Sequence, residues 1–150
     1  MKPQNYPVER LRKMGPSLAE SGGLIVFDDV CVLCSGFVQW VLTHDHNRKF
    51  RFTSAQGPIG QALYKDLGLD PVRFETNLVL IDGIVYGKLG AFVKVATSLG
   101  GVWRAAALLR LLPDGLQDLI YDAIAHNRYL LFGRRSTCWL PSPDTAERVI

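Results

Sequence analysis

The chain has 150 residues, of which 48% are hydrophobic and 21% are charged, a balance typical of a globular protein and not of a disordered one. Its 17 basic and 14 acidic residues give a net charge of +3, too small to indicate a nucleic-acid-binding protein. Three cysteines are too few for a secreted disulfide scaffold and favour a reducing compartment.

The first 22 residues are polar and lack the apolar core of a signal peptide, so we expect residues 1–22 to form a flexible N-terminal arm. No apolar run approaches the roughly 20 residues that span a bilayer. We therefore expect a cytoplasmic protein without a membrane segment.

The first strong structural signal begins at Leu24. Residues 24–27 form a short apolar run that indicates a buried strand. After two aspartates and a valine, helical spacing begins and continues to about residue 44. The apolar residues of one helix face recur at i, i+4, i+7 and i+8, namely Leu33, Phe37, Trp40 and Val41.

The following segments continue an α/β pattern. Residues 50–52 alternate as in a second strand, and Pro58 is suited to the first position of a helix that Gly68 ends. Residues 77–86 place two apolar runs around Asp82-Gly83, a hairpin signal, and a helix over residues 89–99 follows. The order is βαβαββα over a core of residues 23–101, with the first two strands parallel and the last two an antiparallel hairpin of the same sheet.

Beyond Gly101 the pattern is helical only. One segment covers residues 102–112 and stops at Pro113, and Asp114 is suited to cap the next helix. That helix carries apolar residues at core spacing, namely Leu116, Leu119, Ile120, Ala123 and Ile124. We expect residues 102–150 to form a helical extension and tail packed on the core, within a single domain overall.

Two cysteines lie where the first strand passes to the helix N-terminus, a place that stabilises anions such as a thiolate. A C-x-x-C motif beside a βαβ pattern is typical of a redox site. We expect Cys31, at the first turn, to be the more exposed thiol, with a pKa lowered from about 8.5 toward 7 or below, and to act as the nucleophile. Cys34, one turn further and more buried, would be the resolving thiol.

Asp28 ends the strand three residues before Cys31. Two roles remain open for it: it accepts the proton of Cys34 through water, or it caps the helix. Asp29 is interpreted as a solvated turn residue or a cap.

Other functions for the cysteines are less well supported. A zinc site needs four ligands, but one pair is present, Cys138 stands alone, and the histidines are scattered. Two buried cysteines acting as small hydrophobic residues are a further alternative. We interpret Cys138 as an idle thiol, and His44, His46 and His126 as surface residues. The aromatic residues Trp103, Trp139, Tyr121 and Tyr129 are interpreted as core.

The segment FDDVCVLC resembles the D-x-x-C-x-x-C signature of the DCC family of thiol-disulfide oxidoreductases, in which Asp28, Cys31 and Cys34 match the three named letters. The resemblance extends from about residue 24 to 141. It includes residues 36–39, Asp82-Gly83, residues 99–101 with Trp103, residues 127–129, residues 132–133 and residues 138–141.

The resemblance implies a thioredoxin-like fold and a thiol-disulfide oxidoreductase of the protein-disulfide reductase type. The catalytic residues would be Cys31, Cys34 and Asp28. Thiol-disulfide exchange of this kind requires no bound cofactor and no metal. The partner would be a disulfide-containing protein or a small thiol such as glutathione.

The chain departs from the family pattern at two places. The family commonly has glycine where Asp29 stands, and thioredoxins carry a cis-proline where this chain has Thr76-Asn77. The alternative function is a non-catalytic thioredoxin-like binding module, with cysteines that are vestigial or hold a metal. Basic residues able to bind an acidic partner or a glutathione carboxylate are Arg128, Arg134 and Arg135, although solvated charge is the simpler interpretation of each.

Overall fold

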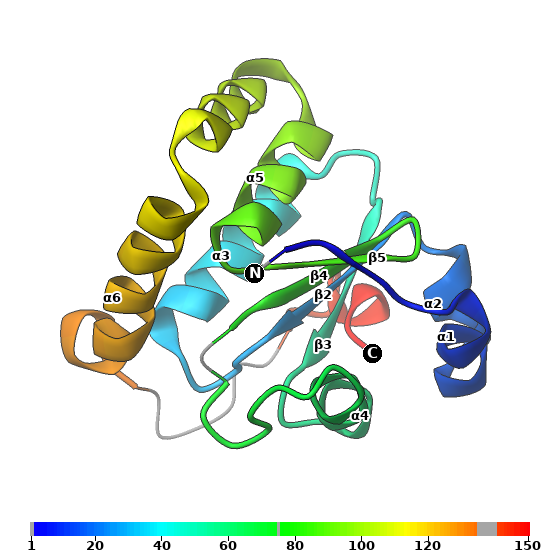
Figure 1. Cartoon of the computed structure of the whole chain (residues 1–150). Coiled ribbons are helices and arrows are strands. Elements are labelled where there is room, and N and C mark those ends of the chain that lie inside the picture. The colour runs from blue at the N-terminus through cyan, green and yellow to red at the C-terminus, as the bar shows by residue number, and fades with distance from the viewer. Residues whose placement is uncertain (1, 75, 135–140) are drawn as a thin grey trace.

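The computed structural model describes residues 2–74, 76–134 and 141–150 (Figure 1). The helices and strands in the first part of the chain are β1 (Gln4–Asn5), α1 (Val8–Met14), α2 (Pro16–Glu20), β2 (Gly23–Phe27), α3 (Val32–His44), β3 (Phe50–Ser54) and α4 (Pro58–Asp66). They are followed by β4 (Leu78–Ile81), β5 (Ile84–Gly87), α5 (Lys88–Leu99), the 3-10 helix η1 (Gly101–Leu111), α6 (Asp114–Phe132) and the short 3-10 helix η2 (Ala146–Arg148).

A five-stranded sheet with the order β1-β5-β4-β2-β3 forms the centre of the molecule. Strands β2 and β3 are parallel, and β4 is antiparallel to both β2 and β5. From β2 to α5 the elements follow the order βαβαββα. The predicted α/β class is thereby confirmed, and the arrangement is consistent with a thioredoxin-like fold.

Both faces of the sheet are covered by helices. Alternate residues of β2 point to opposite sides: Leu24 and Val26 pack with residues of α1, α2 and α4, whereas Ile25 and Phe27 pack with residues of α3 and α5. All five residues of β2 are buried, as expected for a central strand between two helical layers. Figure 1 shows the sheet edge-on between these layers.

The local signals of the hairpin and of α4 act as predicted. Asp82 and Gly83 have φ angles of 52° and 74°, the left-handed conformations that a two-residue turn of this type requires. Pro58 occupies the first turn of α4, where its missing N–H leaves no helical hydrogen bond unmade.

The N-terminal residues differ from the expected flexible arm. Strand β1 pairs with the edge strand β5, and Tyr6, Leu11 and Leu18 are buried in the core. These three side chains lie in a polar segment without a regular apolar period, so the sequence pattern does not reveal their packing. The edge pairing of β1 uses backbone groups, which carry no sequence signal.

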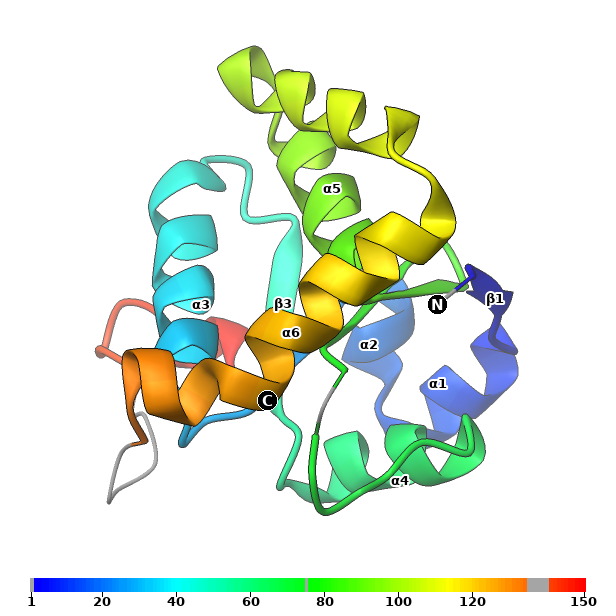
Figure 2. The same cartoon turned by 60° about the vertical axis from the view of Figure 1, so that its left-hand side comes forward.

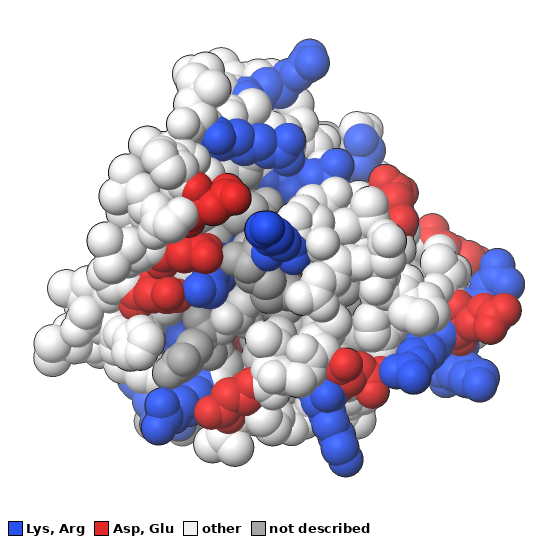
Figure 3. Space-filling model, in the orientation of Figure 1, with Lys and Arg blue, Asp and Glu red and all other residues white. Residues whose placement is uncertain are grey.

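The C-terminal helix α6 lies against α5 and α3, and its last turn reaches the first turn of α3 (Figure 2). The Lys88 ammonium of α5 holds it through the carboxylates of Asp118 and Asp122, at 4.0 and 2.9 Å. Figure 3 shows acidic side chains along this side of the molecule.

The predicted core face of α6 is wrong. Leu116, Ile120 and Ile124 are 41–42% exposed, whereas Ala125 and Arg128 are buried. Asp114 is the first residue of α6 and makes no capping hydrogen bond. The helix continues to Phe132. No helix in the described part of the chain is both long and apolar enough to cross a membrane.

Candidate active site

Cys31 is the N-cap residue of α3, directly after the loop that follows β2. Its Sγ accepts the backbone N–H of Cys34 at 3.4 Å, so the sulfur takes the place that a serine or aspartate oxygen usually occupies at a helix start. The unpaired N–H groups of the first helical turn favour negative charge here.

The pKa values of the two thiols are shifted in opposite directions. A hydrogen bond from the Cys34 thiol lowers the pKa of Cys31 to about 7, helped by the Cys34 backbone N–H and the charge of Arg128, and opposed by burial. The same hydrogen bond, together with burial, raises the pKa of Cys34. At pH 7 the Cys31 thiol is therefore about half ionised while Cys34 keeps its proton, so the negative charge of the pair is centred on the Cys31 sulfur.

The exposure of the two thiols is the reverse of the prediction. Cys31 has no exposed surface, whereas Cys34 is partly exposed. The backbone of Arg134, just beyond the end of α6, pairs with Cys31 in an isolated β-bridge. This contact joins residues about 100 positions apart, so no local sequence pattern signals it.

Asp28 lies at the edge of the sheet where the parallel strands β2 and β3 both end. Its Oδ1 accepts the Gln56 side-chain N–H at 2.6 Å and the Val30 backbone N–H at 3.2 Å. Its Oδ2 accepts the Tyr129 hydroxyl and pairs with the Arg128 guanidinium at 3.2 Å. The carboxylate therefore joins the strand ends to α6.

Two expectations for the aspartates need correction. Asp28 does not cap α3, because Cys31 occupies the N-cap position; the relay role stays a prediction. Asp29 is not solvated: it is 8% exposed, and its Oδ2 accepts the Ser54 hydroxyl at 2.8 Å. The packing of β3 beside β2 brings Ser54 over this turn.

Arg128 is a buried residue of the site and not a solvated charge, because its side chain is 5% exposed. Besides Asp28, its Nη2 donates to the Arg73 carbonyl at 2.8 Å and to the Tyr129 hydroxyl at 3.1 Å. Arg134 is exposed, with its guanidinium 5.4 Å from the centre of the Tyr129 ring. Arg135 lies outside the described residues.

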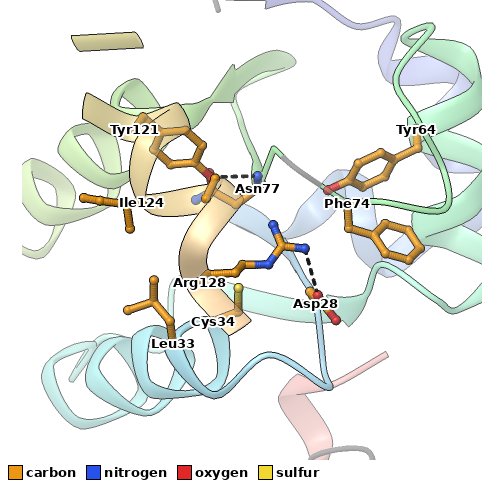
Figure 4. Close-up of a pocket in the computed structure, with 10 residues that line it drawn as sticks. Asp28, Leu33, Cys34, Tyr64, Phe74, Asn77, Tyr121, Ile124 and Arg128 are labelled. Atoms are coloured by element: carbon orange, nitrogen blue, oxygen red, sulfur yellow. Dashed lines mark hydrogen bonds and ion pairs between the residues drawn. The ribbon is translucent and has the colours of Figure 1, made fainter. Parts of the chain in front are cut away.

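A cavity of about 50 Å³ opens onto Cys34. Figure 4 shows Arg128 reaching from α6 towards Asp28, with the Cys34 sulfur beside its side chain. The lining joins charged, polar and apolar groups: Asp28, Leu33, Cys34, Tyr64, Phe74, Asn77, Tyr121, Ile124, Ala125 and Arg128. A space of this size accepts one or two water molecules or a small chemical group.

Helix α6 is hydrogen-bonded to the segment before β4, the place where thioredoxins carry their cis-proline. The Asn77 backbone N–H donates to the Tyr121 hydroxyl at 3.2 Å, and that hydroxyl donates to Asn77 Oδ1 at 2.6 Å. Tyr121 is thus a site residue and not simple core. Its spacing to Ala125 and Arg128, i, i+4 and i+7, was the available signal for this face of α6.

The remaining candidates do not join the site. Within residues 2–74, 76–134 and 141–150, no group of three His, Cys, Asp or Glu side chains is placed to hold a metal ion. Cys138 and Trp139 lie outside the described residues. His46 and His126 are exposed, but His44 is half-buried, with its ring 5.1 Å from that of Trp103, which is itself half-buried.

Comparisons with known proteins show which family the chain resembles over most of its length. The family model of the DCC1-like thiol-disulfide oxidoreductases matches residues 25–134. The chain is 40% identical over 127 residues to the uncharacterized protein YuxK of Bacillus subtilis (strain 168), covering 85% of this chain and 93% of that protein. It is 32% identical over 118 residues to a chloroplastic DCC family protein of Arabidopsis thaliana, covering 78% and 69% of the two chains. The comparison with solved structures gave no match. With a matching family model over most of its length and the cysteine pair at the start of α3, the chain belongs to the DCC1-like thiol-disulfide oxidoreductase family.

Proposed function

We propose that the protein exchanges its Cys31–Cys34 dithiol with the disulfide of a partner protein or of a small thiol such as glutathione, and so reduces that disulfide, in a reducing compartment such as the cytoplasm. The observation that carries this proposal is the Cys31 sulfur at the start of α3, where the Cys34 thiol and backbone N–H both donate to it and lower its pKa to about 7. A thiolate populated at neutral pH is the species that attacks a disulfide.

The reaction has two exchange steps. The Cys31 thiolate attacks one sulfur of the partner's disulfide, forming a mixed disulfide and releasing the other sulfur as a thiolate that takes a proton from water. Cys34 then loses its proton and attacks the Cys31 sulfur, which forms the Cys31–Cys34 disulfide and releases the second partner sulfur. The partner gains two electrons and the Cys31–Cys34 pair loses them.

Asp28 is the third residue of the proposed site. It lines the same cavity as Cys34, which is large enough for a water molecule. We assign to it the transfer of the Cys34 proton through such a water molecule during the second step. Approach of a partner to Cys31 requires a local movement of the chain, because Cys31 has no exposed surface.

A non-catalytic binding module is the second candidate, and the complete burial of Cys31 is the observation in its favour. The deciding experiment oxidises the protein with a small disulfide and follows Cys31 and Cys34 by mass spectrometry. An oxidoreductase forms an internal Cys31–Cys34 disulfide that dithiols reverse, and it loses this reaction in Cys31→Ser. A binding module leaves both thiols free after oxidation.

A further inference from the structure

Arg128 brings a buried positive charge to the dithiol site from a helix outside the βαβαββα core. Its side chain is 5% exposed, and its guanidinium pairs with Asp28. Its hydrogen bonds to Asp28, the Arg73 carbonyl and the Tyr129 hydroxyl are all donated by Nη2. Its Nε is buried and has no hydrogen-bond partner among the described residues. A buried donor of this kind on a charged group is costly unless it is used.

The Arg128 side chain lines the same cavity as the resolving thiol. Figure 4 draws both side chains at this cavity, Arg128 from α6 and Cys34 from α3. The Cys34 thiol is protonated in this state, because its hydrogen bond to Cys31 and its burial raise its pKa. A neutral thiol is a weak acceptor, whereas a thiolate is a strong one.

We propose that Arg128 is a positioning residue of the dithiol site, which holds Asp28 in place and stabilises the Cys34 sulfur when it becomes a thiolate. The role in catalysis rests on the proposed function, because Cys34 becomes a thiolate when it attacks the mixed disulfide. In that step the Cys34–Cys31 bond forms, the bond from Cys31 to the partner sulfur breaks, and the partner sulfur leaves with the electron pair.

Several other groups in the described part of the chain face Cys34, and none of these supplies a positive charge. They are Cys31 at the start of α3, Asp28 after β2, Tyr64 on α4 and Tyr121 on α6. Burial raises the pKa of Tyr121 to about 12 and raises that of Tyr64 further, so both stay neutral in the physiological range. Asp28 and a Cys31 thiolate oppose ionisation of Cys34, whereas Arg128 favours it.

The test isolates Cys34 as the single thiol, in a protein carrying Cys31→Ser and Cys138→Ser. Its alkylation rate is measured by mass spectrometry between pH 6 and 11, alone, with Asp28→Asn, and with Asp28→Asn and Arg128→Met together. The double substitution removes both buried charges and so leaves no unpaired carboxylate. Arg10→Met is the matched control, because Arg10 forms an Arg–Asp ion pair with Asp66 at 3.1 Å on the surface.

We expect Asp28→Asn to speed alkylation of Cys34, and the added Arg128→Met to slow it about tenfold at the same pH, the effect of one pKa unit. Arg10→Met should change nothing. The proposal is overturned if Arg128→Met leaves the midpoint pH of Cys34 alkylation unchanged. A rate that changes by the same factor at every pH also overturns it, because that result reports altered access to the thiol alone.

If circular dichroism shows that the double variant is unfolded, Arg128→Gln replaces Arg128→Met in the Asp28→Asn protein, because glutamine removes the charge but keeps hydrogen-bonding groups. The midpoint pH of Cys34 alkylation must then be higher than with Asp28→Asn alone; an unchanged or lower midpoint overturns the proposal. Because this protein lacks Cys31, the result does not depend on disulfide exchange. Failure of the proposed function would appear separately, as free thiols after oxidation of the unsubstituted protein.

Discussion

Replacement of Cys34 by alanine should raise the pKa of Cys31. The hydrogen bond from the Cys34 thiol is the largest cause of the low Cys31 pKa, and the substitution removes it. The backbone N–H of residue 34, which donates to the Cys31 sulfur at 3.4 Å, remains. The pKa should therefore rise from about 7 toward the ordinary value of about 8.5.

The size of the effect follows from the two limiting pKa values. At pH 7 a thiol with a pKa of about 7 is half ionised, and one with a pKa of about 8.5 is about 3% ionised. The alkylation rate of Cys31 at pH 7 should thus fall by up to about 15-fold, which corresponds to a loss of about 2 kcal/mol of thiolate stabilisation.

The assay is alkylation of Cys31 between pH 5 and 10, read by mass spectrometry in a Cys138→Ser background. Burial of Cys31 slows every rate, so the midpoint pH is compared and not the rate itself. Ser35→Ala serves as the control, because the Ser35 hydroxyl is buried next to Cys34 and has no hydrogen-bond partner among the described residues. A midpoint that stays near 7 in Cys34→Ala, or lies near 8.5 in the parent protein, refutes the reasoning.

Three further predictions concern stability and are measured by urea unfolding. Because the pKa of Cys31 is lower in the folded protein than in the unfolded chain, the free energy of unfolding should rise by about 2 kcal/mol as pH rises from below 7 to about 8.5. This gain is lost as pH falls through 7, and Cys31→Ser should abolish it. Gly60→Ala should destabilise the protein by about 1–3 kcal/mol, because the new Cβ would meet the backbone of β3. Gly36→Ala, which has open space around it in α3, should stabilise the protein by about 0.5–1 kcal/mol. Equal effects of the two substitutions would contradict the packing of α4 on β3. Arg148→Met should cost about 3–5 kcal/mol, because it leaves the buried Asp45 carboxylate without its cation, yet should not move the alkylation midpoint of Cys31.

The sequence predicts those parts of the fold that have local causes. The Asp82-Gly83 turn, the proline at the start of α4 and the apolar run of β2 each act within a few residues, and each is present. The cysteine pair is likewise found at a strand-to-helix junction, because its position depends only on the two neighbouring elements. These signals define the order βαβαββα without knowledge of long-range packing.

The prediction of the core face of α6 was wrong because apolar spacing identifies one face of a helix but does not show which part of the protein that face packs against. The face with Leu116, Ile120 and Ile124 has the stronger apolar pattern and is largely exposed. The packed face carries Tyr121 and Arg128, whose polar ends point into the dithiol site (Figure 4). A polar inner face is stable only where it finds hydrogen-bond partners, and these come from distant segments of the chain.

The burial of Cys31 has the same origin in long-range packing. The sequence places this cysteine at the first turn of α3, where a helix start is ordinarily open to solvent. Cys31 is nevertheless fully buried, and its backbone forms a bridge with Arg134, just after α6, which lies beside α3. Local reasoning thus placed Cys31 correctly at the start of the helix and gave the direction of its pKa shift, but it was wrong about its exposure.

These long-range contacts make the C-terminal residues part of the chemistry and not an accessory to it. The core from β2 to α5 contributes Asp28 and both cysteines, but α6 contributes the cation that pairs with Asp28 and the tyrosine that closes the segment before β4. Without α6, the Asp28 carboxylate would lose its charge partner and Cys31 would lose its cover. Because removal of one member of a buried ion pair costs about 3–5 kcal/mol, residues 23–101 alone are not expected to hold this site. On the proposed role of Arg128, the ionisation of Cys34 therefore depends on a helix that follows the thioredoxin-like core in the chain.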